Sequence, residues 1–367
     1  MRLSICQQCG QRVYFENISC IRCGAILGFD PDTLQITTFS ETEDAFLKPV
    51  NSKAVKKSYR RCANWINHDV CNWVVASDDP QELCVACRLN RTIPDLTKPE
   101  NNTLWLKIEV EKRRLIYSLL SLKLPTSGVD ENTQSLAFDF LADTEETFSE
   151  QGRVLTGHAD GLITLNINEA DPVLREKMRK EMAEPYRTLL GHFRHESGHY
   201  YWDLLVRDTQ WLAPVRELFG DDTLDYSQAL QRHYENGPAA DWQASHISAY
   251  ASMHPWEDWA ETWAHYLHIV DTLETAHEFG LKLQPDTPAG ENLQADVEID
   301  PYKNNSFSEI IRHWLPLSYA LNSLSRSMGH EHLYPFVLAE PVIKKLDLVN
   351  RIVHNQFNSS DKIDSIS

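Results

Sequence analysis

The sequence contains no run of about 18 consecutive apolar residues, and its first residues, MRLSICQQCG, lack the apolar core of a secretory signal. Basic residues are also few: Lys and Arg number 35 against 53 Asp and Glu, which gives a formal net charge of -18 at pH 7. This charge repels nucleic-acid phosphates over most of the surface, although residues 53–61 could form a local basic patch. We therefore expect no membrane-spanning segment and no nucleic-acid partner.

Cysteine is absent after residue 87, because all eight cysteines lie in the first part of the chain. A secreted protein of this size with disulfide bonds would usually have its cysteines spread along the sequence. CxxC pairs are instead typical of metal ligands in a reducing compartment. A cleaved signal would also remove Cys6 and Cys9, which belong to such pairs. The sequence therefore predicts a cytoplasmic protein with metal-binding cysteines.

Two CxxC pairs, each followed by a glycine, lie in the segment CQQCGQRVYFENISCIRCG. A two-residue gap lets both thiolates of a pair face one metal ion, and a glycine relieves crowding where the chain turns back. Four thiolates in a tetrahedral arrangement fit a closed structural zinc site. Residues 1–30 resemble a zinc ribbon. The predicted ligands are Cys6, Cys9, Cys20 and Cys23.

The remaining cysteines form a second set: Cys62, Cys71, Cys84 and Cys87. The last two have CxxC spacing, whereas eight residues separate the first two, and His68 could replace one thiolate. We interpret residues 59–95 as a second four-cysteine zinc-binding module, with buried free thiols as the alternative. Residues 31–58 change from acidic to basic without clear periodicity, which predicts a linker.

Residues 99–367 combine helical and strand patterns. Residues 101–123 have apolar positions at helical spacing, and LAFDFLA and GLITLNI have the pattern of short strands. Further helices are predicted over residues 171–183, 185–206, 255–279, 307–327 and 338–356, with a polar loop at 281–305. We therefore expect an α+β protein in which zinc-ribbon modules precede a mainly helical domain with a small sheet.

Residues 192–202, HFRHESGHYYW, lie in the middle of one predicted helix. His195 and His199 are four residues apart, so both imidazoles project from one face and can reach one zinc ion. Glu196 is placed to activate a water molecule without binding the metal, which is the mechanics of the HExxH motif. Gly198 costs about 1 kcal/mol in a helix interior, which indicates a close approach by another segment. The alternative is a surface helix with solvated histidines.

The segment YASMHPWEDWAETWAHYLHIVD offers a third ligand on a helix that begins at Pro255. Four polar residues share one face of this helix: Glu257, Glu261, His265 and His268. A neighbouring apolar stripe can pack on the HESGH helix: Trp256, Ala260, Trp263 and Leu267. A carboxylate from this helix completes the set of two histidines and one glutamate that catalytic zinc uses, with one position left for water. The alternative is an exposed, salt-bridged helix, which the four tryptophans of residues 242–263 disfavour.

The order HExxH, then a tyrosine, then ExxxE on a later helix resembles gluzincin-type metallopeptidases with a lethal-factor-like arrangement. The cysteine-rich front joined to HESGHYYW and ISAYASMHPWEDWAETWAHYLH is similar to bacterial zinc-binding metallopeptidases with an N-terminal zinc-ribbon domain. This resemblance covers nearly the whole chain. It implies a zincin-like metallopeptidase domain over residues 99–367.

The resemblance also implies roles for single residues. The catalytic zinc would be bound by His195, His199 and Glu257. Glu196 would be the general base, Glu261 would orient a ligating histidine, and Tyr250 would stabilise the oxyanion. Together with the cysteine sets, this predicts one catalytic and two structural zinc ions.

The expected activity is hydrolysis of peptide or isopeptide-like amide bonds. Glu196 would take a proton from the attacking water and pass it to the leaving amine. The strand at residues 161–167 would be the sheet edge along which an extended peptide substrate pairs, and His246, His254 and His265 are expected to be structural. The alternative is a zinc-dependent scaffold that binds a protein partner through its ribbon modules. Glu196 favours the enzyme, because a site that only binds has no use for a base.

Overall fold

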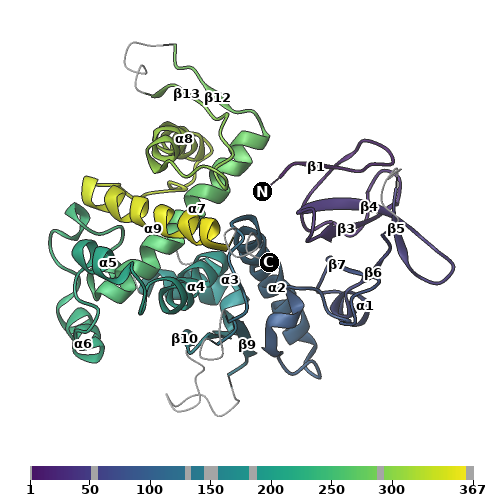
Figure 1. Ribbon diagram of the computed structural model, residues 1–367, viewed down its shortest axis with the longest axis horizontal. Coiled ribbons are helices and arrows are strands. Elements are labelled where there is room, and N and C mark those ends of the chain that lie inside the picture. Colours follow the sequence, from purple (N-terminus) through teal and green to yellow (C-terminus); the bar gives the residue numbers. More distant parts are fainter. Residues whose placement is uncertain are drawn as a thin grey trace. The chain divides into compact units, whose positions relative to one another are not determined.

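The computed structural model describes residues 2–50, 57–128, 134–143, 156–181, 188–286 and 293–360. The chain forms two compact units, shown with their elements in Figure 1. The first unit comprises Met1–Ser121 and Pro125–Met178, and the second comprises Leu122–Leu124 and Arg179–Ser367. Within the described residues, no helix is both long and apolar enough to cross a membrane.

The first unit, which contains both cysteine sets, has a five-stranded antiparallel sheet. Its strands follow the order β3 (Ile26–Asp30), β4 (Gln35–Glu41), β5 (Leu47–Pro49), β6 (Tyr59–Arg61) and β7 (Val74–Ala76). A separate hairpin of β1 (Ser4–Ile5) and β2 (Arg12–Val13) precedes it.

The interpretation of residues 31–58 as a linker is therefore wrong for β4 and β5, which lie inside the sheet. The charged residues around these strands hide a short apolar pattern. Ile36 and Phe39 are each 2% exposed, and Leu47 is fully buried. Since strands this short need only two or three buried side chains, acidic and basic ends can mask them in a sequence.

A second sheet in the first unit has the order β10-β11-β9-β8. These strands are β8 (Asn90–Thr92), β9 (Ala137–Leu141), β10 (Gly157–Ala159) and β11 (Leu162–Asn166). The two strands predicted from LAFDFLA and GLITLNI are confirmed as β9 and β11. However, β11 is paired on both sides, with β10 and with β9, so the expectation that it forms a free edge for a substrate is wrong. The sequence does not reveal this because β10 is only three residues long.

The first unit also contains three helices and two short 3-10 turns among its described residues. They are α1 (Ala63–His68), α2 (Pro99–Ser121) and α3 (Pro172–Glu181), with short 3-10 turns η1 (Cys87–Leu89) and η3 (Ile167–Ala170). The helix predicted at 101–123 is confirmed by α2, which ends two residues earlier. The helix predicted at 171–183 is confirmed by α3 up to residue 181, and residues 182 and 183 lie outside the described part of the chain. Trp105, Ile108 and Leu115 of α2 are fully buried, as its apolar spacing predicts.

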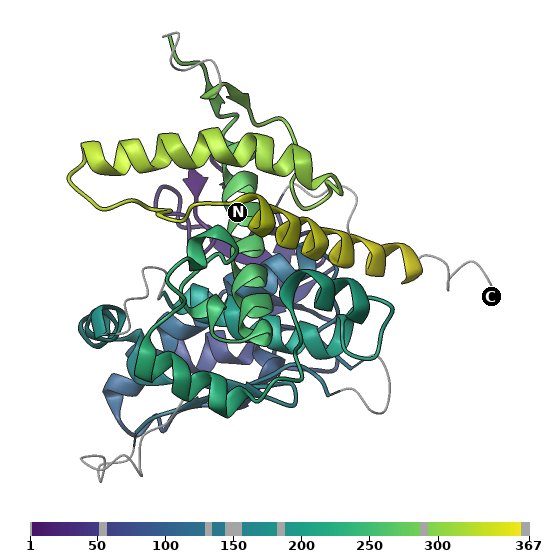
Figure 2. The same ribbon diagram turned by 90° about the vertical axis from the view of Figure 1, so that its left-hand side faces the viewer.

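The second unit is mainly helical. Its long helices are α4 (Leu189–Leu205), α7 (Pro255–Glu278), α8 (Phe307–Ser327) and α9 (Glu340–Ser360), and Figure 2 shows α8 and α9 crossing α7. Its shorter elements are α5 (Leu212–Phe219), α6 (Tyr226–Asn236), η4 (Trp242–Ala244), η5 (Tyr250–Ser252), β12 (Lys282–Leu283) and β13 (Ala295–Asp296). The α+β class, with cysteine-rich modules before a helical domain, is thus confirmed. The β12–β13 hairpin lies within the predicted polar loop.

Helix α4 begins later than the sequence predicts. The side chain of Thr188 accepts a hydrogen bond from Gly191 N at 2.9 Å and caps the helix, which starts at Leu189. The predicted first residues 185–187 lie outside the described part of the chain. Helix α7 begins at Pro255 as predicted, because His254 caps it and proline is well suited to the first helical position.

Helices α4 and α7 pack very closely at Gly198. A Cβ atom added there would lie 2.9 Å from Ala260 Cα and 3.2 Å from Trp263 Cβ, so only glycine fits. Two indole groups of α7 also bond to α4: Trp259 Nε1 donates to Gly198 O at 2.8 Å, and Trp263 Nε1 donates to Ser197 Oγ at 3.1 Å. The predicted close approach at Gly198 is confirmed. It fixes the distance between the polar faces of the two helices.

Candidate metal centres

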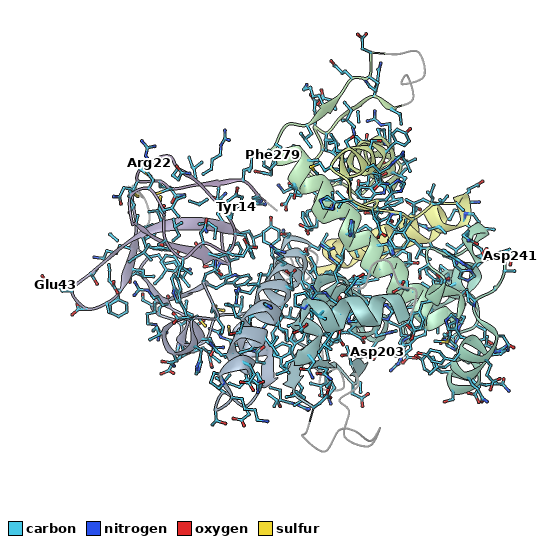
Figure 3. All side chains as sticks on the ribbon, turned by 180° about the vertical axis from the view of Figure 1, so that it is seen from behind. Tyr14, Arg22, Glu43, Asp203, Asp241 and Phe279 are labelled. Atoms are coloured by element: carbon cyan, nitrogen blue, oxygen red, sulfur yellow. The ribbon has the colours of Figure 1, made fainter. Side chains whose placement is uncertain are left out.

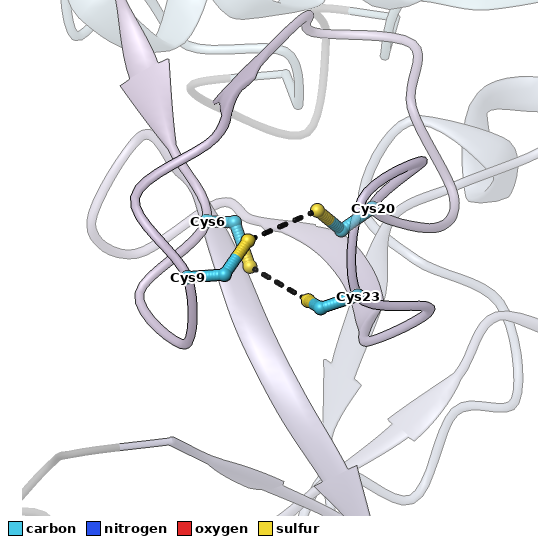
Figure 4. A group of neighbouring side chains, drawn as sticks. All are labelled: Cys6, Cys9, Cys20 and Cys23. Atoms are coloured by element: carbon cyan, nitrogen blue, oxygen red, sulfur yellow. Dashed lines mark hydrogen bonds between the residues drawn. The ribbon is translucent and has the colours of Figure 1, made fainter.

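The first cysteine set gathers four sulfur atoms, shown in Figure 4. Cys6 Sγ lies 3.6 Å from Cys23 Sγ, and Cys9 Sγ lies 3.6 Å from Cys20 Sγ. A disulfide bond is only about 2.05 Å long, and all four cysteines are free. A tetrahedral zinc ion with bonds of about 2.3 Å has sulfur atoms about 3.8 Å apart. The observed spacing therefore fits four thiolates around one ion.

The two turns of this set have the same backbone geometry. Gly10 and Gly24 both have φ of 73°. Gly10 N donates to Cys6 O, and Gly24 N donates to Cys20 O, both at 2.8 Å. Because a positive φ strains residues that carry a Cβ, the glycine after each pair is what lets the turn close.

The second cysteine set has similar sulfur distances in a more buried setting. Cys71 Sγ lies 3.8 Å from Cys84 Sγ and 3.7 Å from Cys87 Sγ, and all four members of the set are buried. His68 is not among them, because its ring lies against Trp105 at 5.5 Å between centroids. The structure thus brings together the four cysteines predicted from the sequence, and His68 does not replace any of them.

Ionisation of this second set is costly without a positive charge nearby, because its four thiols are buried. Burial and the neighbouring cysteines raise the pKa of Cys84 well above its usual value, because adjacent thiolates repel one another in a dry site. Arg113 of α2 is also buried there. Burial lowers its pKa, but the charges of Cys71 and Glu109 outweigh this and raise it. Four thiolates around a dication would leave a net negative charge, which the Arg113 guanidinium would offset.

A third group brings together atoms of α4 and α7 in the second unit. His195 Nε2 lies 3.0 Å from Glu257 Oε2, and His199 Nε2 lies 3.6 Å from the same oxygen. Ligand atoms around a tetrahedral zinc ion with bonds of about 2.0–2.2 Å are about 3.3–3.6 Å apart. Among the described residues, Glu257 Oε2 is buried and has no hydrogen bond of regular geometry. These three atoms therefore fit a metal ion with an open position.

The charges at this group are complementary. Burial opposes ionisation of Glu257, but His199 and His195 outweigh it and hold the pKa of this carboxyl well below its usual range. Burial likewise disfavours a charged His195, yet the adjacent carboxylates of Glu257 and Glu261 raise its pKa well above the usual value. The site therefore holds a carboxylate that attracts positive charge, whether a proton or a metal ion.

Two further side chains hold this group in place, one of which the sequence indicated. Glu261 Oε1 lies 2.7 Å from His195 Nδ1, which leaves His195 Nε2 directed at Glu257. Ser248 Oγ donates to Glu261 Oε2 at 2.6 Å and fixes the carboxylate in turn. Ser248 was not predicted, since no spacing rule connects a loop serine to a helix thirteen residues later. Such hydrogen bonds orient a ligating histidine.

Tyr226 was also not predicted and lies at the centre of the site. Its hydroxyl donates to Glu257 Oε1 at 2.8 Å, and it is hydrogen-bonded to Tyr250. Burial raises the pKa of both phenols, so both remain neutral donors. Tyr226 opens α6, which the sequence did not predict, and no motif includes it.

The predicted base and oxyanion residue both lie beside the group. Glu196 is half-buried on α4, and within the described part of the chain it makes no hydrogen bond or ion pair. It follows His195 directly on the helix and adds to the negative charge near Tyr226, which raises the pKa of that phenol. The Tyr250 ring lies 6.1 Å from the His195 ring, measured between centroids.

The other histidines of this region have structural contacts. His254 Nδ1 accepts from Trp256 N at 3.1 Å, and its Nε2 lies 3.0 Å from Leu224 O. His265 Nδ1 lies 2.9 Å from the Tyr334 hydroxyl. Neither therefore belongs to the metal group, although His265 shares a helix face with Glu257 and Glu261.

Comparison with known proteins agrees with this geometry. Residues 101–352 match a family model described as "Putative zinc-binding metallo-peptidase", and residues 3–98 match a model of a zinc-ribbon domain. Two uncharacterized proteins, one of Mycobacterium tuberculosis and one of Mycobacterium bovis, are each 44% identical to this chain over 355 residues. The matched residues cover 96% of this chain and 95% of each relative. No solved structure matches the chain. From the family match and these relatives, we conclude that the chain belongs to this family of zinc-binding metallopeptidases, with a zinc-ribbon domain before the peptidase region.

Proposed function

We propose that this protein is an active zinc-dependent peptidase that hydrolyses peptide or isopeptide-like amide bonds. The observation that carries the proposal is the convergence of His195 Nε2, His199 Nε2 and Glu257 Oε2 beside the uncommitted carboxylate of Glu196. His195, His199 and Glu257 would hold the catalytic zinc. The two cysteine sets would each hold a structural zinc.

A zinc ion at this group would supply Lewis-acid polarisation of the substrate carbonyl and would lower the pKa of a water molecule. The protein's own residues provide the proton transfers. Glu196 has no other bonding partner in the described residues, so its oxygens are free to accept a proton from the attacking water. The same carboxyl would then deliver that proton to the leaving amine.

Glu261 and Ser248 would keep the site in its reactive arrangement. Because Glu261 holds His195 Nδ1, the Nε2 lone pair remains directed at the metal position. Tyr226 would do the same for Glu257, since its hydrogen bond to Oε1 leaves Oε2 for the metal. We propose that Tyr250, which donates its hydroxyl hydrogen to Tyr226 in this structure, turns that hydrogen to the oxyanion that forms during attack.

Removal of metal tests the proposed function directly. Purified protein should contain three zinc ions per chain. One should be bound by each of the two cysteine sets, and one by His195, His199 and Glu257. Brief chelation should remove the catalytic ion first, and cleavage of a peptide library should stop with it. Addition of one equivalent of zinc should restore cleavage. One zinc ion or none in carefully prepared protein, or cleavage that survives loss of the catalytic ion, would contradict the proposal.

Tyr250→Phe should lower kcat by about 10²–10³, because it deletes the donor to the oxyanion and keeps the ring. Tyr226→Phe should weaken zinc affinity by about 10-fold, because Glu257 loses a supporting hydrogen bond. The measurements are kcat on a library-derived peptide and zinc affinity by competition with a chelator. Wild-type kcat in Tyr250→Phe would make Tyr250 a packing residue.

A second candidate function is a scaffold that binds a protein partner through the zinc-ribbon domain. The observation that favours it is that large hydrophobic side chains near the first cysteine set are exposed: Tyr14 is 77% exposed and Ile21 is 87% exposed. Figure 3 labels Tyr14 and the neighbouring Arg22. A partner could cover these side chains whether or not the protein cleaves its substrate. The cleavage assay decides between the two, since a scaffold without activity does not need Glu196.

A further inference from the structure

A cavity of about 420 Å³ lies in the second unit beside the metal group. Its walls come from the end of α5, one face of α6, the turn after α6, and residues 251–255. Its volume falls within the range of about 300–1,000 Å³ that is usual for ligand sites. Nothing described above assigns a role to it.

A single aromatic side chain connects this cavity with the proposed active site. The ring of His233, which lines the cavity, lies 5.8 Å from the ring of Tyr250, measured between centroids. The Tyr250 ring also lies 6.1 Å from the His195 ring, measured between centroids. Ala251 and Ser252, which follow Tyr250 in η5, also line the cavity. A peptide held at the metal group could therefore place a neighbouring residue in the cavity.

The charge of the cavity is opposite to that of the chain as a whole. None of its lining residues, all in the described part of the chain, is Asp or Glu, although Asp and Glu outnumber Lys and Arg by 53 to 35. Arg232, His233 and Asn236 point from one face of α6, since they are spaced as neighbours on a helix. Arg232 makes no ion pair or hydrogen bond with any other described residue. Its guanidinium is therefore available to an anionic ligand.

The other two histidines of the cavity do not compete for this role. His254 uses both ring nitrogens, for the α7 cap and for Leu224 O. Burial and the charge of Lys345 lower the pKa of His246 to about 4, so its ring is neutral at physiological pH. Arg232 is thus the permanent cation of the cavity, with His233 and Asn236 beside it as hydrogen-bonding groups.

Apart from Ser252, the rest of the wall is apolar and includes Phe219 and Met253, which are 6% and 8% exposed. An apolar wall with an arginine at the mouth suits an aliphatic stem that ends in a carboxylate. Arginine binds carboxylates through two parallel hydrogen bonds, which lysine does not form. We propose that the cavity binds a carboxylate of the peptide substrate through Arg232, either an acidic side chain or the C-terminal carboxylate. The proposal rests on the proposed peptidase function.

Binding measured without cleavage tests the cavity independently of the activity. The protein is the full chain with Glu196→Gln, loaded with zinc. The probes are four alanine pentapeptides that carry an uncharged BODIPY dye at the N-terminus, with Glu or Gln at the middle position and with a free or amidated C-terminus. Fluorescence anisotropy gives the affinity of each. Preference for Glu over Gln identifies an acidic side chain as the ligand, and preference for the free over the amidated end identifies the C-terminal carboxylate.

Adding Arg232→Ala should lower the affinity for the preferred acidic peptide by about 10-fold, because one charge-assisted pair is lost. The affinity for the neutral, amidated peptide should not change. Arg232→Lys should recover only part of that loss. Arg326→Ala is the control, since Arg326 is an exposed arginine of the same unit outside the cavity. Arg232 is itself exposed, so melting temperatures should stay equal.

Three results would overturn the proposal: no acidic peptide binds measurably, Arg232→Ala weakens all four peptides equally, or Arg326→Ala has the same effect as Arg232→Ala. These outcomes are separate from failure of the proposed function. Arg232-dependent binding in a protein that never cleaves peptides would support the cavity and reject the peptidase. Cleavage of peptides, together with a peptide affinity that does not change in Arg232→Ala, would support the peptidase and reject the cavity.

Discussion

Glu196→Gln should lower kcat by about 10²–10⁴, the usual contribution of a positioned general base, while the zinc content and the fold are retained. Glutamine has nearly the same shape as glutamate but accepts no proton at neutral pH. Since Glu196 is half-buried and bonded to no other described residue, its replacement breaks no structural contact. The measurements are kcat on a library-derived peptide, zinc per chain and melting temperature.

The matched control for this variant is Glu217→Gln. Glu217 is an exposed glutamate of α5 in the same unit, so this change removes the same charge away from the metal group. We expect its kcat to equal that of the wild type. Near-wild-type turnover in Glu196→Gln would remove this residue from the mechanism.

Glu257→Ala should abolish binding of the catalytic zinc, whereas Glu261→Ala should weaken it by about 10–100-fold. The reason is geometric: Glu257 Oε2 lies within 3.0 Å of His195 Nε2 and 3.6 Å of His199 Nε2, so it is placed as a ligand. Glu261 instead bonds to His195 Nδ1, on the far side of the ring. Its loss would free the ring to turn but would leave the three ligand atoms present.

Zinc per chain after gel filtration, followed by competition with a chelator, measures both effects. Because Glu257 is buried, Glu257→Gln should also be prepared, which keeps the volume and the hydrogen bond from Tyr226 while it removes the charge. Both cysteine sites should stay filled in every variant. A stronger loss of zinc in Glu261→Ala than in Glu257→Ala would mean that Glu261 is the ligand.

Local spacing accounts for the parts of the site that could be predicted from the sequence. The CxxC pairs bring neighbouring thiols together whatever the rest of the chain does, and positions four apart on a helix share a face. The sequence also indicated the close packing at Gly198, because glycine in a helix interior is costly without a reason. In the structure this reason is the approach of Ala260 and Trp263.

Contacts between distant segments account for the parts that could not be predicted. Tyr226 reaches Glu257 from a helix 31 residues earlier, and Ser248 reaches Glu261 from a loop. Arg113 lies near the second cysteine set although 26 residues separate it from Cys87 (113 − 87 = 26). The sequence carries no periodic signal for such pairs, since each depends on how separate elements pack.

The sequence by itself determined the family, the α+β class and which residues are chemically able to bind zinc, because these depend on residue type and short-range spacing. Only the tertiary structure decided that residues 35–41 and 47–49 are strands of a sheet, that β11 has neighbours on both sides, and that Glu257 Oε2 faces both histidines. Strand pairing and side-chain convergence are set by packing between segments far apart in the chain. The Gly198 contact is the physical link between the two levels: a residue visible in the sequence fixes a helix separation that exists only in the fold.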